Sequence, residues 1–303
     1  MKAALKRFLA GDVWYSFRHS PVAIGAALVA AVCVFCAVFA GWVAPHNPFD
    51  LATLELSDAR LPPAWEEGGQ ARYLLGTDDQ GRDILSALMY GARISLFVGG
   101  VSVLLSVVVG VGLGLLAGFV GGRVDAFIMR VCDVMLSFPP TLIALLIDGA
   151  GRAMFPEAAE HLAFAVLIIA ISLSYWVQYA RTVRGSTLVE RNKEYVQAAR
   201  VIGVHPLRIM FRHVLPNVTG PVLVLATIQV ALAIITEATL SFLGVGVPPT
   251  QPSLGTLIRV GNDFLFSGEW WITVFPGVML VLIALSVNLL GDWLRDALNP
   301  RLR

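Results

Sequence analysis

The sequence predicts an all-α integral membrane protein with six transmembrane helices, a long outer loop between the first two spans and a structured polar loop between the fourth and fifth. Of the 303 residues, 57% are hydrophobic and only 14% are charged, and the mean hydropathy is +0.74. Soluble domains carry about 25% charged residues. The apolar residues also gather in runs of about 20, the length that crosses a bilayer as a helix.

Six apolar runs are long enough to span, at about 22–44, 94–119, 127–147, 162–180, 218–240 and 271–290. They predict one transmembrane domain over residues 22–303, preceded by a short cytoplasmic segment, 1–21. The first run is too long for the apolar part of a signal peptide and indicates a retained span. The third contains Pro139 and Pro140, which predict a kink or a break in that helix.

The distribution of lysine and arginine predicts the orientation. Six spans place both termini on one side, and most of the 22 basic residues fall in the segments on that same side. Because basic residues are enriched in cytoplasmic segments, we expect both termini in the cytoplasm. The loop 181–217 is then cytoplasmic, and the loop 45–93 is outside.

The outer loop 45–93 is rich in acidic residues and turn-forming residues. Within it, Thr77-Asp78-Asp79-Gln80 is typical of a helix-capping box. The apolar residues of 83–90 fall on one side of the helix that would follow, which predicts an amphipathic segment on the outer membrane face. The acids are explained either by a solvated loop or by contact with an outer partner or the pore mouth.

The inner loop 181–217 has the pattern of folded structure. Glu190 to Ile202 is predicted as a helix with Ala198 and Ala199 on its surface. Gly203 follows at a position that favours a left-handed residue, and Pro206 can begin a second helix. Leu215-Pro216 is expected to end that second helix. Two short helices with a small-residue surface at a membrane face suit docking to a partner.

Several kinds of active site are disfavoured by the sequence. No phosphate-binding loop of the G-x-x-x-x-G-K-[ST] type is present, so ATP-driven transport would need another subunit as the ATPase. No arrangement of histidines, or of Cys33, Cys36 and Cys132, suggests a metal, redox or catalytic centre. The net charge of +1 gives no indication of nucleic-acid binding. Glycines 110, 112, 114 and 118 of the second span predict close helix packing.

Glu237 lies near the outer end of the predicted fifth span. An acid inside a membrane is costly and usually faces a cavity or a partner. It either lines the transport path or stabilises a gate, or else it lies shallowly at the interface or bonds backbone in the turn 241–249. The segment that follows, up to Ile258, is predicted as a turn and a short surface or re-entrant helix.

These motifs together resemble one family along nearly the whole chain. The inner loop resembles the EAA loop of ABC-transporter permease subunits, with Gln197 and His213 replacing the usual Glu and Ile. The chain is similar to the branch that carries oligopeptides, dipeptides and nickel, and most of all to its dipeptide members. The segments that carry this resemblance are Pro62-Pro63-Ala-Trp65, Leu75–Asp79, Gly81-Arg-Asp83, Gly91-Ala-Arg93, Ser241–Gly244, Pro248–Thr250, Asn288–Asp292, Leu294–Leu298 and Pro300.

The resemblance implies a heteromeric importer in the bacterial cytoplasmic membrane. A second homologous permease, two ATPase subunits that hold ATP and Mg²⁺, and an extracytoplasmic peptide-binding protein would be the partners, with membrane lipid around the spans and a peptide as the cargo. This chain itself would bind no cofactor and catalyse no reaction. The residues expected at the ATPase are Glu194, Gln197, Ala198, Ala199, Arg200, Gly203, Pro206, Leu215 and Pro216. Those expected at the binding protein are Trp65, Asp78, Asp79, Arg82 and Asp83, with Glu237 as the pathway or gate residue.

Two alternatives stay open. A transporter of the same branch carrying nickel, glutathione or longer oligopeptides would have a similar sequence. A secondary transporter or channel working without ATP belongs to another class, but such proteins usually place ionisable residues at the bilayer midplane.

Overall fold

The computed structural model describes residues 12–50, 54–154, 159–247 and 250–297, and in these ranges the regular structure is helical apart from one isolated bridge between Thr77 and Asp83. Parts of three sequence predictions lie outside the described residues. They are residues 1–11 of the N-terminal segment, 248–249 of the turn after the fifth span, and 298–303 at the end of the last motif. The helices are α2 (Asp12–Arg18), α3 (Pro21–Val38), α4 (Ala40–Val43), η1 (Leu56–Asp58), α5 (Ile84–Val120), α6 (Gly122–Leu136), α7 (Pro140–Met154), α8 (Ala159–Glu190), α9 (Glu194–Val201), α10 (Pro206–Ile209), η3 (Met210–Val214), α11 (Leu215–Phe242), α12 (Leu254–Asn262), η4 (Leu265–Ser267) and α13 (Trp271–Ala297).

The long helices fit five spans, or the predicted six if one bent helix pair also crosses the membrane. In the described residues, α3, α5, α8, α11 and α13 each contain a stretch that is long and apolar enough to cross a membrane. The pair α6 and α7 passes the same test only when taken together, and it is bent by 93° at the break before Pro140, so it makes a sixth span if the pair crosses as one. The break is where the two prolines predict it, since the ring of a proline cannot continue a regular helix.

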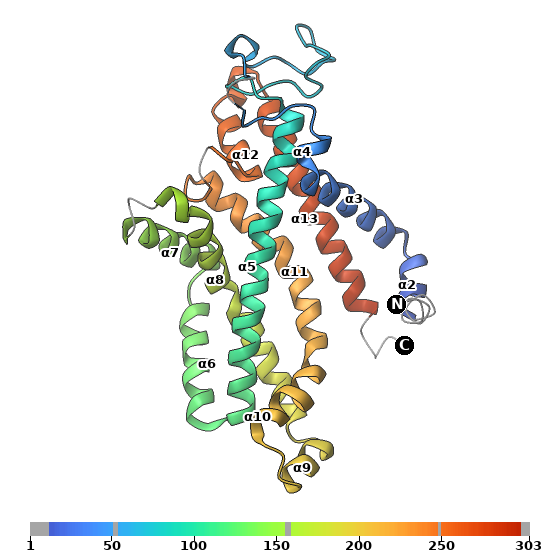
Figure 1. Ribbon diagram of the computed structural model, residues 1–303, viewed down its shortest axis with the longest axis vertical. Coiled ribbons are helices and arrows are strands. Elements are labelled where there is room, and N and C mark those ends of the chain that lie inside the picture. Colours follow the sequence, from blue (N-terminus) through green and yellow to red (C-terminus); the bar gives the residue numbers. More distant parts are fainter. Residues whose placement is uncertain (1–11, 51–53, 155–158, 248–249, 298–303) are drawn as a thin grey trace.

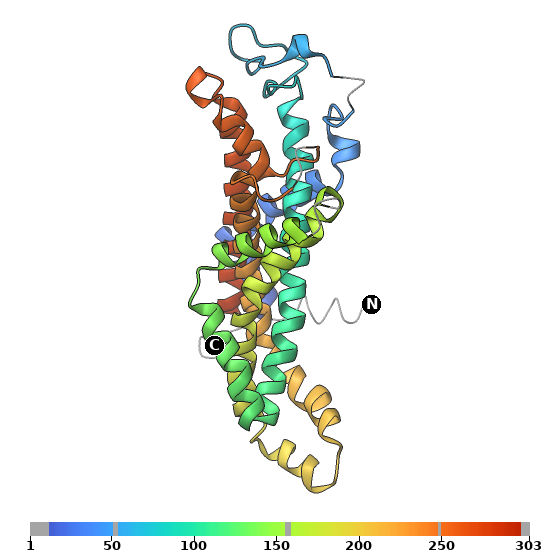
Figure 2. The same ribbon diagram turned by 90° about the vertical axis from the view of Figure 1, so that its left-hand side faces the viewer.

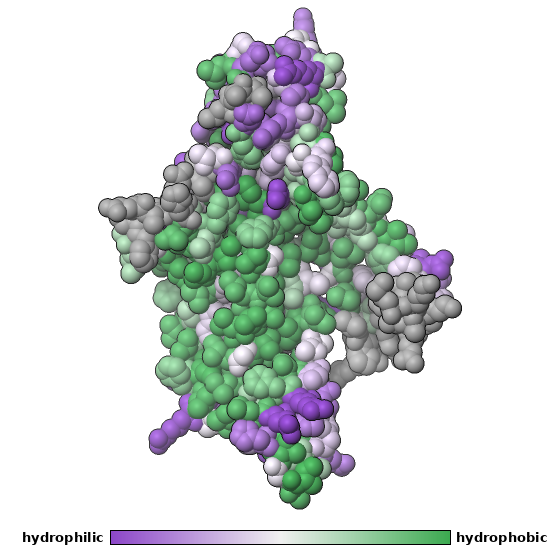
Figure 3. All heavy atoms as spheres, viewed as in Figure 1, coloured by the Kyte–Doolittle hydropathy of each residue, from purple (hydrophilic) through white to green (hydrophobic). Residues whose placement is uncertain are grey.

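The spans form an elongated bundle around α5, α8 and α11 (Figure 1). Buried side chains of these three helices, such as Val98, Ile171 and Ala233, belong to one core cluster. Hydrophobic residues cover the middle of the visible face, and hydrophilic residues gather toward both ends (Figure 3). This distribution matches a molecule whose middle is surrounded by lipid.

Glycines bring α5 and α8 into close contact, as the sequence predicts. A Cβ atom at Gly110 or Gly114 would lie 2.4 Å from a main-chain oxygen of α8, and one at Gly118 would lie 2.7 Å from the Thr187 side chain. Gly112 differs, since nothing lies within 4 Å of its Cβ position. Three of the four predicted glycines therefore let the backbones approach to a distance that no larger residue allows.

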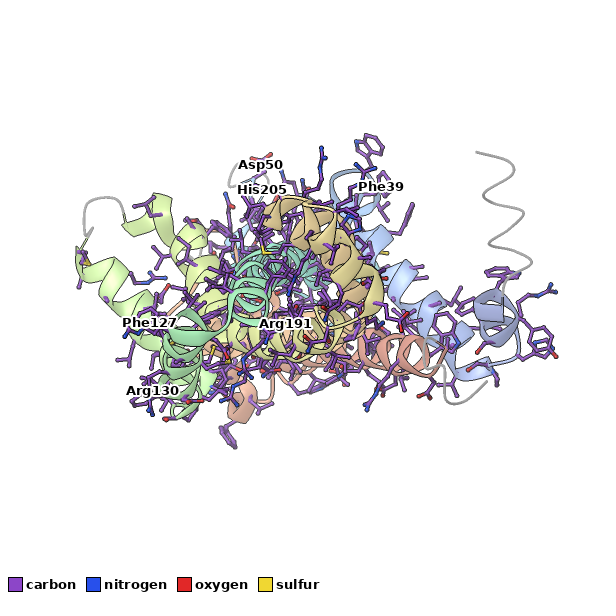
Figure 4. All side chains as sticks on the ribbon, turned by 90° about the horizontal axis from the view of Figure 1, so that it is seen from below. Phe39, Asp50, Phe127, Arg130, Arg191 and His205 are labelled. Atoms are coloured by element: carbon purple, nitrogen blue, oxygen red, sulfur yellow. The ribbon has the colours of Figure 1, made fainter. Side chains whose placement is uncertain are left out.

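Ion pairs hold α6 against the C-terminal half of α8. The Arg184 guanidinium bonds both carboxylate oxygens of Asp125, and Arg181 pairs with Asp133. Seen from below, Phe127 and Arg130 lie at the side of the bundle on α6, whereas Arg191 lies beneath its middle (Figure 4). Past the bend, α7 also packs on α8.

The first and last described helices meet. The indole N–H of Trp293 in α13 donates to Ser16 of α2 at 3.3 Å, and the Phe17 ring packs edge-on against the Trp293 ring. α2 and the C-terminal end of α13 lie at about mid-height of the molecule, well above α9 and α10 (Figure 1).

Candidate functional site

The helix α9 and the turn after it project from one end of the bundle (Figures 1 and 2). Gly203 has a φ of +79°, which is the left-handed conformation that its position predicts. The Val204 N–H donates to the Ala199 oxygen and the Gly203 N–H donates to the Arg200 oxygen. This pair of bonds is a Schellman motif, which ends α9 and satisfies its last carbonyl groups.

The predicted bounds of these short helices need correction. A turn at 191–193 separates α8 from α9, so the expected continuous helix from Glu190 to Ile202 is interrupted. Pro206 does begin α10, where the His205 side chain accepts the Leu207 N–H. Pro216 does not end the second helix, which continues as α11. The π-helical turn η3 directly before Pro216 widens the helix where the proline ring would otherwise crowd the preceding turn.

One face of α9 packs against its own chain. Val196 and Ala199 are buried in the same core cluster as Ile209, Met210 and Val214. The expectation that Ala199 lies on the surface is therefore wrong, because α9 turns this residue toward α10 and into the core cluster. Its small size allows close packing inside the chain.

The opposite side of the projection exposes apolar side chains. Val201 is 87% exposed, Ile202 is 77% exposed and Leu207 is 56% exposed. The predicted residues Glu194, Gln197 and Ala198 are exposed as well. An exposed apolar cluster on a polar projection marks an interaction site. These three apolar residues are absent from the sequence-based site, although the pair Val201-Ile202 directly before the helix-ending glycine could have indicated them.

A cluster of hydrogen-bonded side chains at the base of the projection joins α9 to the ends of α8 and α11. Its members are Glu190, Lys193, Tyr195 and Asn217. The Tyr195 hydroxyl bonds the Glu190 carboxylate and accepts from the Asn217 amide at 3.0 Å. The Lys193 ammonium lies 2.7 Å from the other Glu190 oxygen. Burial and the Glu190 carboxylate raise the pKa of Tyr195 to about 12, so the phenol stays protonated at physiological pH. Sequence reasoning missed this base.

Two arginines connect this region to the end of α5. The Arg191 guanidinium donates to the Gly118 oxygen at 2.7 Å, in the last turn of α5. The Arg200 guanidinium lies 5.5 Å from the centre of the Phe119 ring, a cation–π distance. The projection is thus anchored to the inner ends of α5, α8 and α11.

At the other end of the molecule, the predicted outer contact residues are largely buried. Asp78 and Arg82 form an ion pair with a 2.6 Å contact, and Asp78 also accepts the main-chain N–H groups of Gln80 and Arg82. Trp65 is 59% exposed. Asp79 is half-buried, and burial together with the neighbouring Asp78 raises its pKa. Trp65 and Asp79 are therefore the members of this set that have surface to offer.

Asp83, and not Thr77, caps the helix of the second span. Its carboxylate accepts from the Ser86 N–H at 2.9 Å, and α5 then runs without a break from Ile84 to Val120. The expected separate surface helix over 83–90 is the first part of α5. Thr77 instead accepts the Leu61 N–H and donates to the Asp58 oxygen, which fastens the outer loop. Both residues are good caps locally, and packing decides between them.

Glu237 is fully buried where α5, α11 and α12 meet. Its two carboxyl oxygens accept from the Ser95 hydroxyl at 2.6 Å and from the Ser241 hydroxyl at 2.7 Å. Both oxygens therefore bond side-chain hydroxyls rather than the backbone of the turn 241–249. Its assignment to a pathway or gate stays a prediction.

No group of three His, Cys, Asp or Glu residues that could hold a metal ion occurs in the part of the chain that the structure describes. The projection contains no nucleophile held by a base. Its geometry suits contact with another protein.

Comparison with known proteins connects both ends of the chain to membrane transport. Residues 110–303 match the family described as "Binding-protein-dependent transport system inner membrane component". Residues 9–63 match the "N-terminal TM domain of oligopeptide transport permease C".

Three relatives match almost end to end. The chain is 42% identical over 293 residues to the di/tripeptide transport system permease protein DppC of Pseudomonas aeruginosa (strain UCBPP-PA14), covering 96% of this chain and 92% of the relative. It is 43% identical over 293 residues to the dipeptide transport system permease protein DppC of Escherichia coli (strain K12), with coverages of 96% and 93%. For DppC of Haemophilus influenzae (strain ATCC 51907 / DSM 11121 / KW20 / Rd), the identity is 37% over 292 residues, with coverages of 96% and 95%.

Solved structures share the fold. The chain matches a structure of the inward-facing MetNI methionine ABC transporter with a TM-score of 0.56 and 18% identity, over 70% of this chain and 96% of that chain. A second crystal form of MetNI gives a TM-score of 0.54 and 17% identity with the same coverage.

Proposed function

The chain belongs to the family of binding-protein-dependent transport system inner membrane components, and from that premise we propose that it is the permease subunit of an ATP-driven importer of dipeptides and short oligopeptides. The cargo is proposed from the relatives, which are named as dipeptide or di/tripeptide permeases. The projection formed by α9, the 202–205 turn and α10 would couple the chain to an ATPase. We call residues 194–209 the inner projection.

The observation that carries the proposal is the contrast between the two faces of the inner projection. Its exposed face carries Val201, Ile202 and Leu207, while its other face is fixed to the core. Exposed apolar residues provide the buried centre of an interface with a partner. A partner that shifts the projection therefore also shifts the helices to which it is fastened.

The transmission route follows from how the projection is fixed. α10 leads through η3 directly into α11, and the Tyr195 base joins α9 to the end of α8. When two ATPases approach each other on binding ATP, they would displace the projection. Because the projection is joined to α8 and α11, both helices would tilt with it. Alternating opening of the path to the two faces would follow from that tilt.

The remaining partners are proposed from the family. A second permease would complete the path, and two ATPase subunits would hold the ATP and Mg²⁺, while this chain takes no part in hydrolysis. An extracytoplasmic binding protein would deliver the cargo to the outer loop, where Trp65 and Asp79 have surface to offer. Asp78, Arg82 and Asp83 would shape that loop. The excess of basic residues in the inner segments supports cytoplasmic termini.

Purification tests this function directly. The tagged chain is isolated from mild detergent, its co-purifying subunits are identified, and ATP hydrolysis is measured with binding protein loaded with a dipeptide. We expect a second permease and ATPase subunits, and hydrolysis that the loaded binding protein stimulates. Uptake assays with dipeptide, longer peptide, Ni²⁺ and glutathione then identify the cargo. Recovery of the chain without any ATPase subunit would contradict the proposal.

A further inference from the structure

A buried carboxyl group joins three helices near the outer end of the bundle. Glu237 of α11 accepts from Ser95 of α5, and the same Ser95 oxygen accepts the Leu254 N–H in the first turn of α12 at 3.3 Å. Ser253, the N-cap of α12, is a third hydroxyl within hydrogen-bonding reach of the carboxyl group. Glu237 is thus connected to the start of α12 by two serines that come from different segments.

The helix α12 packs so closely against α5, α11 and α13 that the glycines between them leave no spare room for a larger side chain. A Cβ at Gly255 would lie 2.3 Å from the Ala238 oxygen of α11, and one at Gly261 would lie 2.6 Å from the backbone of Ile272 in α13. On α5, a Cβ at Gly91 would lie 3.3 Å from the Leu254 nitrogen. The short helix therefore rests directly on the backbones of three spans, so any shift of α12 against them must break the Glu237 contacts as well.

Packing alone does not explain why a carboxyl group is used here. Apolar residues of similar volume replace buried polar groups with little loss of stability, or with a gain. A buried acid in a membrane helix therefore indicates a role in function or in selecting one arrangement. Hydroxyl contacts to a carboxyl group are directional, so they define one position of α12 and are lost together when the helix moves.

We propose that Glu237 is a positioning residue for transport: through Ser95 and Ser253 it holds α12 against α5 and α11 as a latch at the outer end of the bundle, so that ATP is hydrolysed only in step with cargo movement. The inference rests on the proposed importer function. It assigns to Glu237 control of one helix position and no contact with the peptide.

The test uses the complete importer in lipid vesicles with Glu237→Gln, which keeps the size of the side chain but replaces one of the two oxygens that accept from Ser95 and Ser241 with an amide that can only donate. We expect normal assembly, a several-fold higher ATP hydrolysis without binding protein, and at least a five-fold loss of peptide taken up per ATP.

Ser253→Ala should act in the same direction, and Ser253→Thr, which keeps a hydroxyl, should restore coupling. Ser106→Ala is the matched control, because Ser106 is as buried on α5 but bonds only main-chain oxygens.

A second readout reports the position of α12 itself. Thr256 is 5% exposed and is close in size to cysteine. In a background with Cys33, Cys36 and Cys132 replaced by alanine, Thr256→Cys should react slowly with a membrane-impermeant maleimide added outside. Adding Glu237→Gln should accelerate the reaction several-fold, while Ser106→Ala should not.

The outcomes separate the latch from the importer function. If the unaltered complex neither hydrolyses ATP nor takes up peptide, the importer proposal fails. If it does both and Glu237→Gln leaves uptake per ATP unchanged, the latch proposal is wrong. An unchanged labelling rate at position 256 would also overturn the latch, even where uptake falls.

Discussion

The inner projection and α12 are both short helical segments between long spans, yet they relate to the bundle in opposite ways. The inner projection stands out from the bundle and exposes Val201 and Ile202, whereas α12 is seated on three backbones with Leu254 and Leu257 buried. The projection leaves apolar surface exposed, and α12 has its contacts satisfied within the chain. The difference teaches that the projection can pass on an external movement, while α12 can only respond to one.

Placing charge on the exposed face of the projection should cause the largest loss of ATPase binding and of uptake. Val201→Asp combined with Ile202→Asp would place two carboxylates in an interface whose centre excludes water, where the few residues that dominate binding contribute about 2 kcal/mol or more each. We expect at least a ten-fold loss of ATPase subunits recovered with the chain and a matching loss of uptake. Val189→Asp is the control, since Val189 is 66% exposed at the end of α8 but lies outside the projection. Equal loss in the control would show that any added charge is harmful.

Two adjacent acids of the outer loop, Asp78 and Asp79, should affect its stability in opposite ways. Asp78→Asn breaks a buried ion pair with Arg82 and should destabilise the outer loop by about 3 kcal/mol. Asp79→Asn should be neutral or stabilising at pH 7. The raised pKa of Asp79 means that the folded loop favours the protonated acid, so the loop loses stability as the pH rises through that pKa. Limited proteolysis of the loop measures both variants. The comparison breaks down if Asp79→Asn is the more sensitive variant.

The angle of the projection depends on Gly203. The left-handed φ there costs a non-glycine residue about 1 kcal/mol or more, although nothing lies within 4 Å of the Cβ position. We expect uptake to fall in the order Asn, Ala, Val at this position, because Asn tolerates the conformation best, with a several-fold loss for Val and normal membrane insertion. Ala199→Leu should also reduce uptake, by overpacking the buried face of α9 at about 1–3 kcal/mol. Normal uptake by Gly203→Val would remove the requirement for this turn.

The smallest effect is expected at the base of the projection. Tyr195→Phe removes a hydroxyl that contacts Glu190 and Asn217, which costs about 1 kcal/mol. The pKa of Tyr195 is raised to about 12, so the stability that its protonated form contributes is complete below pH 10 and is lost as the pH rises toward 12. Thermal unfolding at pH 7 and pH 8 should therefore show the same difference between the two proteins. A difference that changes between these pH values would contradict this role.

The sequence was sufficient where local physics decides the structure. Pro139 and Pro140 break the third span, and Gly203 takes a positive φ, because each outcome depends on one residue's own backbone limits. Burial could not be predicted in the same way. Ala199 and Asp78 lie in polar surroundings in the sequence, and only the packing of the folded chain shows that both are buried. Ser95 and Glu237 meet across 142 positions of the chain, a distance over which periodicity carries no information.

The central claim is that the inner projection contacts an ATPase. The most direct measurement places a photo-reactive amino acid at Ile202 in the assembled complex, with the same label at Trp65 in the outer loop as a control, since both residues are well exposed. The account predicts a cross-link from position 202 to the ATPase subunit that weakens when Val201→Asp is added, and no such product from position 65. A cross-link from position 202 only to lipid or to the outer binding protein would contradict it.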